Sequence, residues 1–256
     1  MIDVQHLVKS FSLTKKQRAE MGIDSTTVKA VDDVSFTCQP GRIFSLLGPN
    51  GAGKTTTLRM IATILKPTSG SIRVAGHDVS TQPRDVRASI GFLTGSTGLY
   101  QRLTPNEVIQ YFGDLYRMEP TVFSQRKEEL FDLLGIHEFA NKKIGQLSTG
   151  MKQKVSIART MIHDPDVVVF DEPTSGLDVI TAENIIKLIR DSKAQGKTVI
   201  FSSHIMSEVD LLCDDLAIIH KGRIHYSGTM DEFRTTYKDY TLTEAFIRVV
   251  EQPEAV

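Results

Sequence analysis

A glycine-rich segment constrains the fold of this chain more than any other feature. It fits the phosphate-loop pattern G-x-x-x-x-G-K-[ST], follows the apolar residues 43–47 and precedes a helical pattern over 55–65. Its glycines let successive backbone N–H groups turn toward one anion, and the following helix directs its positive N-terminus at the same anion. The segment therefore predicts a phosphate-binding turn formed by Gly48, Pro49, Asn50, Gly51, Ala52, Gly53, Lys54, Thr55 and Thr56.

Three side chains of this segment carry chemistry. Lys54 can reach the β- and γ-phosphates of a nucleotide, and Thr55 supplies a hard oxygen for Mg²⁺. Thr56 can donate a hydrogen bond to the α-phosphate. An ordinary glycine turn is the alternative, but the strand before the segment and the helix after it favour the phosphate site.

Two carboxylates complete the predicted site. Asp171 and Glu172 follow the apolar residues 167–170, which predict a buried strand. We expect Asp171 to bind Mg²⁺ through water and Glu172 to polarise the attacking water. A capped strand end would explain this pair alone, and the predicted phosphate loop in the same chain makes that alternative less favoured.

Strand patterns alternate with helical patterns along most of the chain, whereas residues 105–163 are mainly helical in character. This order indicates an α/β fold with a helical insertion. The polar residues 12–27 predict a solvated loop or a short surface helix. Strands are predicted over 2–8, 28–36, 43–47, 71–75, 90–93, 167–170, 198–201, 216–219 and 223–226, and helices over 55–65, 122–134, 151–162, 180–194 and 207–212, with another opened by Pro105.

The charge of the chain is balanced, with Lys+Arg 30, Asp+Glu 31 and a formal net charge of -1. This balance argues against a dedicated nucleic-acid binder. Cys38 and Cys213 are isolated, which argues against a structural zinc site and a disulfide framework. We see no signal peptide, and no apolar stretch approaches the ~20 residues that cross a bilayer. We therefore expect the chain to be soluble by itself.

Three further motifs carry a resemblance to a known family. Residues 147–153 (Leu-Ser-Thr-Gly-Met-Lys-Gln) resemble the signature motif of the ATP-binding cassette (ABC) family, residues 175–178 (Ser-Gly-Leu-Asp) its D-loop, and His204 its switch histidine. The resemblance implies a P-loop NTPase cassette over 1–236, with ATP and Mg²⁺ as cofactors. It further implies a mainly parallel core sheet, an N-terminal antiparallel β-subdomain, a helical subdomain at approximately 96–163 and a helical tail over 237–256.

The resemblance also implies a shared mechanism in which two cassettes stack head to tail around two ATP molecules. The signature of one protomer would cover the ATP on the phosphate loop of the other through Ser148, Thr149 and Gly150. This is physically reasonable because a helix that begins near Gly150 would direct a second positive end at the γ-phosphate. Asp178 would bridge the two protomers near the phosphate loop.

Glu172 and His204 are the catalytic residues that the resemblance implies. His204 would contact the γ-phosphate, either orienting it or sensing its loss. A histidine after an apolar strand is more often structural when considered alone, and its place in Phe-Ser-Ser-His after Asp171 favours the functional role.

Two positions need separate comment. Phe11 stands where the family places an aromatic ring against adenine, although an apolar plug at a strand end would also explain it. Gly95 stands where the family usually has glutamine, which ligates Mg²⁺ or the attacking water. Either water, Thr94 or Ser96 substitutes for that side chain, or the metal shell is completed differently, or the alignment is shifted by a residue.

The first functional hypothesis is the ATPase subunit of a membrane exporter. The signature resembles that of the NatA-type branch, which is associated with sodium extrusion and related exports. The implied partners are a second ABC subunit, identical or paired, and polytopic permease subunits on separate chains, with no nucleic acid. The implied location is cytoplasmic, peripheral on the inner face of the cell membrane. We expect residues 91–118 to form the docking surface, with some side chains lining a groove and others packing inward: Leu99, Tyr100, Phe112 and Tyr116.

The second hypothesis is a soluble ABC ATPase that acts on ribosomes or DNA, although the chain shows neither tandem cassettes nor long heptad arms. A non-hydrolytic regulatory module is disfavoured by Lys54, Asp171 and Glu172. Residues 141–144 (Asn-Lys-Lys-Ile) lack the aspartate that would recognise guanine, which excludes a small GTPase.

In the tail, helical spacing predicts an amphipathic helix that packs on the domain or on the twin subunit. Its apolar side would carry Leu242, Phe246, Val249 and Val250.

Overall fold

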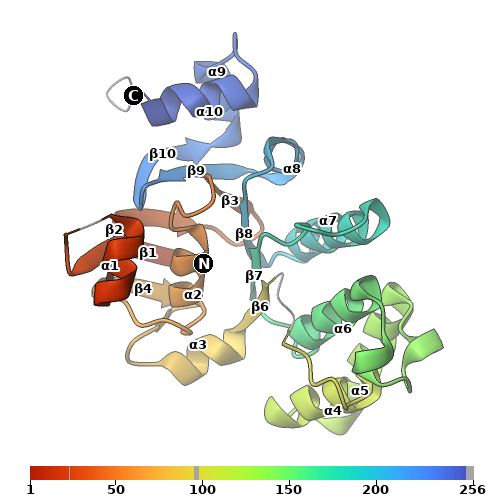
Figure 1. The fold of residues 1–256 in the computed structure, drawn as a ribbon. Helices are drawn as coiled ribbons and strands as arrows, with labels where there is room; N and C mark the ends of the chain where they lie inside the picture. The colour runs from red at the N-terminus through yellow and green to blue at the C-terminus, as the bar shows by residue number, and fades with distance from the viewer. Residues whose placement is uncertain (23, 95–97, 252–256) are drawn as a thin grey trace.

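Two β-sheets organise the computed structural model, which describes residues 1–22, 24–94 and 98–251 (Figure 1). The larger sheet has the order β10-β9-β3-β8-β7-β6, and its strands are parallel except for the antiparallel pair β9–β10. All residues of β3, β7 and β8 are buried, as expected for a parallel sheet covered on both faces. The strands are β3 (Ile43–Leu47), β6 (Ile90–Thr94), β7 (Val167–Asp171), β8 (Thr198–Ser203), β9 (Asp215–His220) and β10 (Arg223–Thr229).

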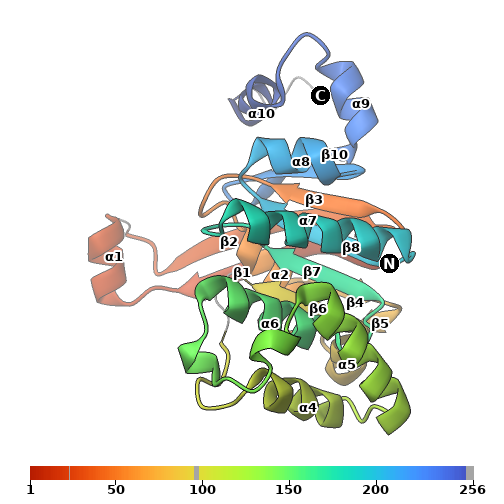
Figure 2. The same ribbon diagram turned by 90° about the vertical axis from the view of Figure 1, so that its right-hand side faces the viewer.

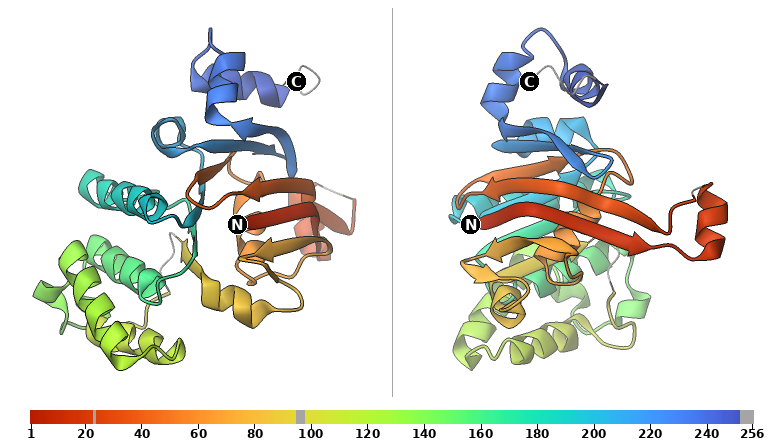
Figure 3. Two further views of the ribbon diagram at one scale, coloured as in Figure 1. Left: turned by 180° about the vertical axis from the view of Figure 1, so that it is seen from behind. Right: turned by 90° about the vertical axis from the view of Figure 1, so that its left-hand side faces the viewer.

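The smaller sheet is antiparallel and has the order β2-β1-β4-β5. Its strands are β1 (Ile2–Ser12), β2 (Thr27–Cys38), β4 (Ser69–Val74) and β5 (His77–Asp78). The polar stretch between β1 and β2 contains the short surface helix α1 (Lys15–Met21), one of the two structures predicted for it. Figure 3 shows α1 at the tip of the β1–β2 hairpin, well away from the rest of the chain.

Helices cover the larger sheet and form a separate block beside it. Figure 2 shows α4, α5 and α6 packed together at the end opposite to α9 and α10. The helix α4 begins with a capping box between Thr104 and Glu107, which satisfies backbone donors at its first turn. The block consists of α4 (Pro105–Leu115), α5 (Pro120–Leu134) and α6 (Thr149–Met161), and the helices next to the sheet are α2 (Lys54–Ile61), α3 (Pro83–Ser89), α7 (Val179–Ala194) and α8 (Met206–Leu212).

The strand β7 separates two hydrophobic clusters. Val168 and Phe170 belong to the cluster that includes the helical block, whereas Val167 and Val169 belong to the cluster beneath the antiparallel sheet. Successive side chains of a strand point to opposite faces, so this short run supports both halves of the core. The carboxyl end of β7, which carries Asp171, is therefore held in place from two sides.

The C-terminal helices α9 (Met230–Thr236) and α10 (Leu242–Glu251) pack on the rest of the same chain. Ala245 and Val249 of α10 are almost completely buried, and the predicted amphipathic helix is therefore confirmed in this region. The sequence left two arrangements open for this helix, and in the structure it packs on its own domain. The division of the chain at residue 236 stays a prediction.

Several element predictions need correction. The helix predicted over 55–65 ends at Ile61, because Thr63 adopts a left-handed conformation with φ 59° and the N–H groups of Ile64 and Leu65 both return to the Arg59 carbonyl. The helices α3 and α9, with 7 residues each, were not predicted. Among the described residues, no helix is both long enough and apolar enough to cross a membrane.

Substitution of Val249 by aspartate tests the packing of α10. We expect Val249→Asp to lower the free energy of unfolding by roughly 2–4 kcal/mol, because it buries a carboxylate without a partner. Ile247→Asp is the matched control, since Ile247 lies on the same helix and is 45% exposed. Chemical denaturation measures both variants, and equal losses would contradict the observed orientation of the helix.

Candidate active site

The phosphate loop connects β3 to α2, and two of its glycines cannot be replaced without a clash. A Cβ on Gly48 would lie 2.2 Å from the Ile219 carbonyl oxygen, and one on Gly53 would lie 2.5 Å from that of Ala30. Gly53 also has φ 108°, a conformation that favours glycine. The loop lines a cavity of about 280 Å³, together with Ala30 and Glu172. This cavity is where the sequence placed the phosphates.

Lys54 is the central cation of the cavity. Lys54 is only 4% exposed, and its Nζ donates to the carbonyl oxygens of Gly48 at 2.7 Å and Pro49 at 3.1 Å. The same nitrogen lies 3.1 Å from Glu172 Oε1. A buried ammonium needs acceptors of this kind, since it has lost most of its contact with water. The three donors of the ammonium are thus directed at the loop and at the adjacent carboxylate.

Thr55 and Asp171 meet although they are far apart in the sequence. Thr55 Oγ1 donates to Asp171 Oδ1 at 2.9 Å, and Ser202 Oγ donates to the same oxygen at 2.9 Å. A hydroxyl and a carboxylate are hard oxygen donors, which suit Mg²⁺. Among the described residues, no group of three or more His, Cys, Asp or Glu side chains is arranged to hold a metal, so protein ligands alone would not complete a metal shell here. The donor set therefore fits a Mg²⁺ ion that also takes ligands from phosphate and water.

Glu172 adopts a left-handed backbone conformation with φ 47°, which is uncommon for a residue with a side chain. Its N–H donates to Ser202 Oγ at 3.0 Å and to the Ser202 carbonyl oxygen at 3.2 Å. These bonds support the strained residue at the end of β7. Glu172 Oε1 then lies between Lys54 and His204, whose Nδ1 is 3.4 Å away. The carboxylate is thereby directed at the phosphate-loop cavity.

His204 follows directly after β8, and hydrogen bonds stabilise the turn around it. Ser203 Oγ donates to Glu208 Oε2 at 2.8 Å and accepts from the N–H of Ile205 at 2.9 Å. Thr174 also hydrogen bonds to Glu208. The sequence analysis did not identify Ser202, Ser203 or Glu208, although two serines at the carboxyl end of a buried strand could have indicated the first two.

The signature lies close to the first turn of α7, since a Cβ on Gly150 would lie 3.7 Å from Asp178 Oδ2. Ser148 caps α6 by accepting from the N–H of Met151 at 3.2 Å, and Asp178 caps α7 by accepting from the N–H of Thr181 at 3.0 Å. A Cβ on Gly150 would lie only 3.1 Å from Thr181 Oγ1. The hydrogen bond from the Thr181 backbone is the main cause of a lowered pKa for Asp178, so this carboxyl stays ionised at neutral pH.

The predicted in-trans residues lie outside the phosphate-loop cavity. Ser148, Thr149, Gly150 and Asp178 are absent from the residues that line it. Ser148 and Thr149 are exposed, and α6 begins at Thr149, as expected for a helix end that is available to a second molecule. Within one chain, the structure brings together Lys54, Thr55, Asp171, Glu172 and His204, but not the signature.

Two predicted residues remain apart from this group. Phe11 lies on β1 opposite Val28, is half-buried, and has Lys9 Nζ 5.1 Å from its ring centroid. It does not line the phosphate-loop cavity, and its contact with adenine stays a prediction. Gly95 lies outside the described residues.

A glycine-rich loop around a buried lysine, with hard oxygen donors and a glutamate beside it, is typical of a P-loop nucleotide hydrolase. Residues 31–175 match the model of the family described as "ABC transporter". The chain belongs to this family, and it is an ABC ATPase that binds ATP with Mg²⁺. The predicted family and the cassette fold are thus confirmed.

Individual relatives agree with this assignment. The chain is 45% identical to the ABC transporter ATP-binding protein NatA of Bacillus subtilis over 86% of this chain and 90% of that protein. It is 35% identical to the linearmycin resistance ATP-binding protein LnrL of the same species over 78% of this chain and 64% of the relative.

Solved structures show the same architecture. An ATP-binding subunit of an ABC transporter has a TM-score of 0.84 and 25% identity, with 98% of this chain and 99% of the other covered. An ATP-binding cassette solved as a dimer in a post-hydrolysis state with ADP and Pi has a TM-score of 0.77 and 25% identity, with 90% and 99% covered.

Removal of the Lys54 ammonium tests the phosphate site. We expect Lys54→Ala to abolish tight MgATP binding, because the cation that is directed at the loop is lost. Lys16→Ala is the control, since Lys16 is an exposed lysine on α1. Isothermal titration calorimetry measures both variants. Normal MgATP affinity in Lys54→Ala would overturn the assignment of the loop.

Proposed function

We propose that the chain is the ATP-hydrolysing subunit of an exporter and works as one of two cassettes that drive separate membrane subunits. The observation that carries this proposal is the arrangement of Glu172 between Lys54 and His204, with the signature exposed on the same chain but outside the cavity. In this proposal, one chain supplies the catalytic carboxylate, and a second chain covers the terminal phosphate, since no described residue of the signature lines the cavity.

Each residue of the phosphate-loop cavity and its surroundings has a role in this proposal. Lys54 binds the β- and γ-phosphates, and Thr55 with Asp171 holds Mg²⁺, which neutralises charge on the phosphates. Glu172 accepts a hydrogen bond from the attacking water and polarises it. His204 contacts the γ-phosphate. In the structure, Lys54 contacts Glu172 directly, so phosphate must displace this ion pair when ATP binds.

The second cassette would supply the cover through Ser148, Thr149, Gly150 and Asp178. Two large apolar side chains directly after Asp178 support an interface at this place. Val179 is 85% exposed and Ile180 is 77% exposed, the highest values among the exposed large hydrophobic residues of the described chain. Burial of such side chains against a second copy is favourable by roughly 25 cal/mol per Å² of apolar surface.

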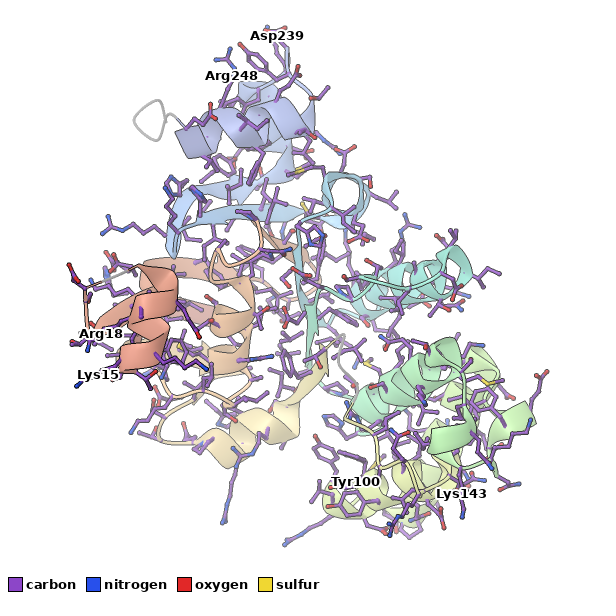
Figure 4. All side chains as sticks on the ribbon, viewed as in Figure 1. Lys15, Arg18, Tyr100, Lys143, Asp239 and Arg248 are labelled. Carbon is purple, nitrogen blue, oxygen red and sulfur yellow. The ribbon has the colours of Figure 1, made fainter. Side chains whose placement is uncertain are left out.

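Docking to a membrane subunit would use the region 91–118 and place the chain peripherally on the inner face of the membrane. Leu99 is buried in the core of the helical block, whereas Tyr100 is 61% exposed. Phe112 and Tyr116 are half-buried and line a groove between the block and the larger sheet. Figure 4 labels Tyr100 on the helical block. These side chains thus divide between the core and the surface.

Export as the direction of transport is supported by a relative that is named a Nod factor export protein, from Burkholderia lata, which is 37% identical to this chain. Sodium is the cargo that we propose from the NatA-type signature, together with the 45% identity to NatA. ATP-dependent ²²Na⁺ movement in vesicles that contain the purified transporter tests this cargo. No observation in the structure favours action on ribosomes or DNA.

Substitution of Glu172 tests hydrolysis. We expect Glu172→Gln to retain ATP binding but to slow turnover by on the order of a hundredfold or more, because the amide cannot polarise water as a carboxylate does. Steady-state phosphate release measures the turnover. Glu128→Gln serves as the control, because Glu128 is exposed on α5. Unchanged turnover in Glu172→Gln would mean that another group is the base.

Co-purification tests the transport role. We expect the tagged chain to be recovered from detergent-solubilised membranes in a stable complex with a polytopic membrane protein. Mass spectrometry identifies the partner. Recovery with ribosomes alone would refute this function and favour the soluble alternative.

A further inference from the structure

A second cavity lies among α8, α9 and α10, at the end of the molecule opposite to the helical block (Figure 2). It has a volume of about 240 Å³, and none of its lining residues lines the phosphate-loop cavity. We call it the C-terminal cavity. Small-ligand sites are mostly apolar pockets that carry a few polar groups, and this cavity has that composition. Its apolar side is formed by Met230, Phe233, Tyr237, Tyr240, Leu242 and Ala245.

Aromatic rings form part of the wall of the C-terminal cavity. Phe233 is 1% exposed, and its ring centroid lies 4.8 Å from that of Tyr237. Tyr240 is 40% exposed, and the guanidinium of Arg248 lies 4.1 Å from its ring centroid. This contact holds the Tyr240 ring at the edge of the cavity. Aromatic surfaces of this kind favour a ligand with a planar ring, because such a ring can stack on them.

The charged groups of the cavity favour an anion. Arg234 Nη2 donates to the carbonyl oxygen and to Oδ1 of Asp210, each at 2.9 Å. A guanidinium has five N–H donors, so the other nitrogens of Arg234 keep donors for a ligand. Lys238 also lines the cavity, is exposed, and makes no hydrogen bond or ion pair within the described chain. Because Asp210 is the one carboxylate in the described lining, the cavity has one cation in excess.

The helix α8 connects this cavity to the active site. Asp210 lies on α8 together with Glu208, which hydrogen bonds to Ser203 and Thr174. Ser203 directly precedes His204. Because a short helix moves as a rigid unit, a shift of Asp210 would also move Glu208 and the turn that carries His204.

We propose that the C-terminal cavity is an effector site for a small aromatic carboxylate that regulates ATP hydrolysis. Its ring stacks on Tyr237 and Tyr240, and its carboxylate pairs with Lys238 and with the free donors of Arg234. This pairing competes with Asp210 for Arg234 and thereby alters the position of α8. The inference goes beyond the proposed function, because it concerns hydrolysis by this chain and not the membrane subunits or the cargo.

Binding of 2-naphthoate tests the site. The chain contains no tryptophan, so the fluorescence anisotropy of the naphthalene ring reports binding directly. Excess MgADP keeps the probe out of the phosphate-loop cavity. We expect Lys238→Glu to weaken binding at least tenfold, because it reverses the unpaired charge. Lys187→Glu is the matched control, since Lys187 is exposed on α7 and does not line the cavity.

A probe with the same ring and the opposite charge separates charge recognition from apolar contact. We expect 2-(aminomethyl)naphthalene, which is a cation at neutral pH, to bind the unmodified chain at least tenfold more weakly than 2-naphthoate. No binding of 2-naphthoate, equal binding of the two probes, or unchanged affinity in Lys238→Glu would each overturn the inference.

Steady-state phosphate release at saturating MgATP tests the link through α8. We expect saturating 2-naphthoate to change kcat at least twofold in the unmodified chain and in Lys187→Glu. At the same concentration, kcat of Lys238→Glu should stay constant, and without probe all three chains should hydrolyse ATP equally fast. An unchanged kcat in the unmodified chain with the probe bound would contradict the effector role. An equal change in Lys238→Glu would also contradict it, because the effect would then arise outside this cavity.

Discussion

A buried ammonium group organises the active site of this ABC ATPase. Lys54 has almost no contact with solvent, and its Nζ is held by two carbonyl oxygens of the phosphate loop and by Glu172. Because a buried cation must keep acceptors around it, the loop, the helix α2 and the end of β7 have to stay together. In the proposed mechanism, ATP binding would replace Glu172 by phosphate as an acceptor for Lys54, and Glu172 would then be available to water.

The parallel register of the larger sheet places these acceptors at one edge. Asp171 is opposite Ser202 in the β7–β8 pair, and Leu47 is opposite Ser203 in the β3–β8 pair. The carboxyl ends of β3, β7 and β8 are therefore level, which brings the phosphate loop, Glu172 and His204 to the same edge of the sheet. Since all three strands are buried on both faces, the fold positions the site through its core rather than through surface loops.

Local motifs made part of this site predictable from the sequence. The phosphate loop and the pair Asp171–Glu172 each depend on neighbouring residues, so their roles could be inferred without a fold. Ser202 was missed because its two hydrogen bonds to Asp171 and Glu172 depend on strand register, which no motif encodes. The protrusion of α1 was likewise not predictable, because a polar stretch indicates solvent contact but not direction.

The proposed roles of Ser148 and Asp178 at the ATP site depend on a second molecule. In the single chain, each residue caps a helix and lies outside the phosphate-loop cavity. The same cap that stabilises α6 leaves its N-terminus exposed, which is what a composite ATP site would need. The cassette dimer solved with ADP and Pi shows that chains of this fold can pair, so the central claim concerns where this pairing places the signature.

The most direct test is a crystal structure of the Glu172→Gln chain with MgATP. A composite ATP site predicts two chains head to tail, with each ATP between Lys54 of one chain and Ser148 of the other. ATP on the phosphate loop of a solitary chain, with Ser148 far from the γ-phosphate, would contradict it.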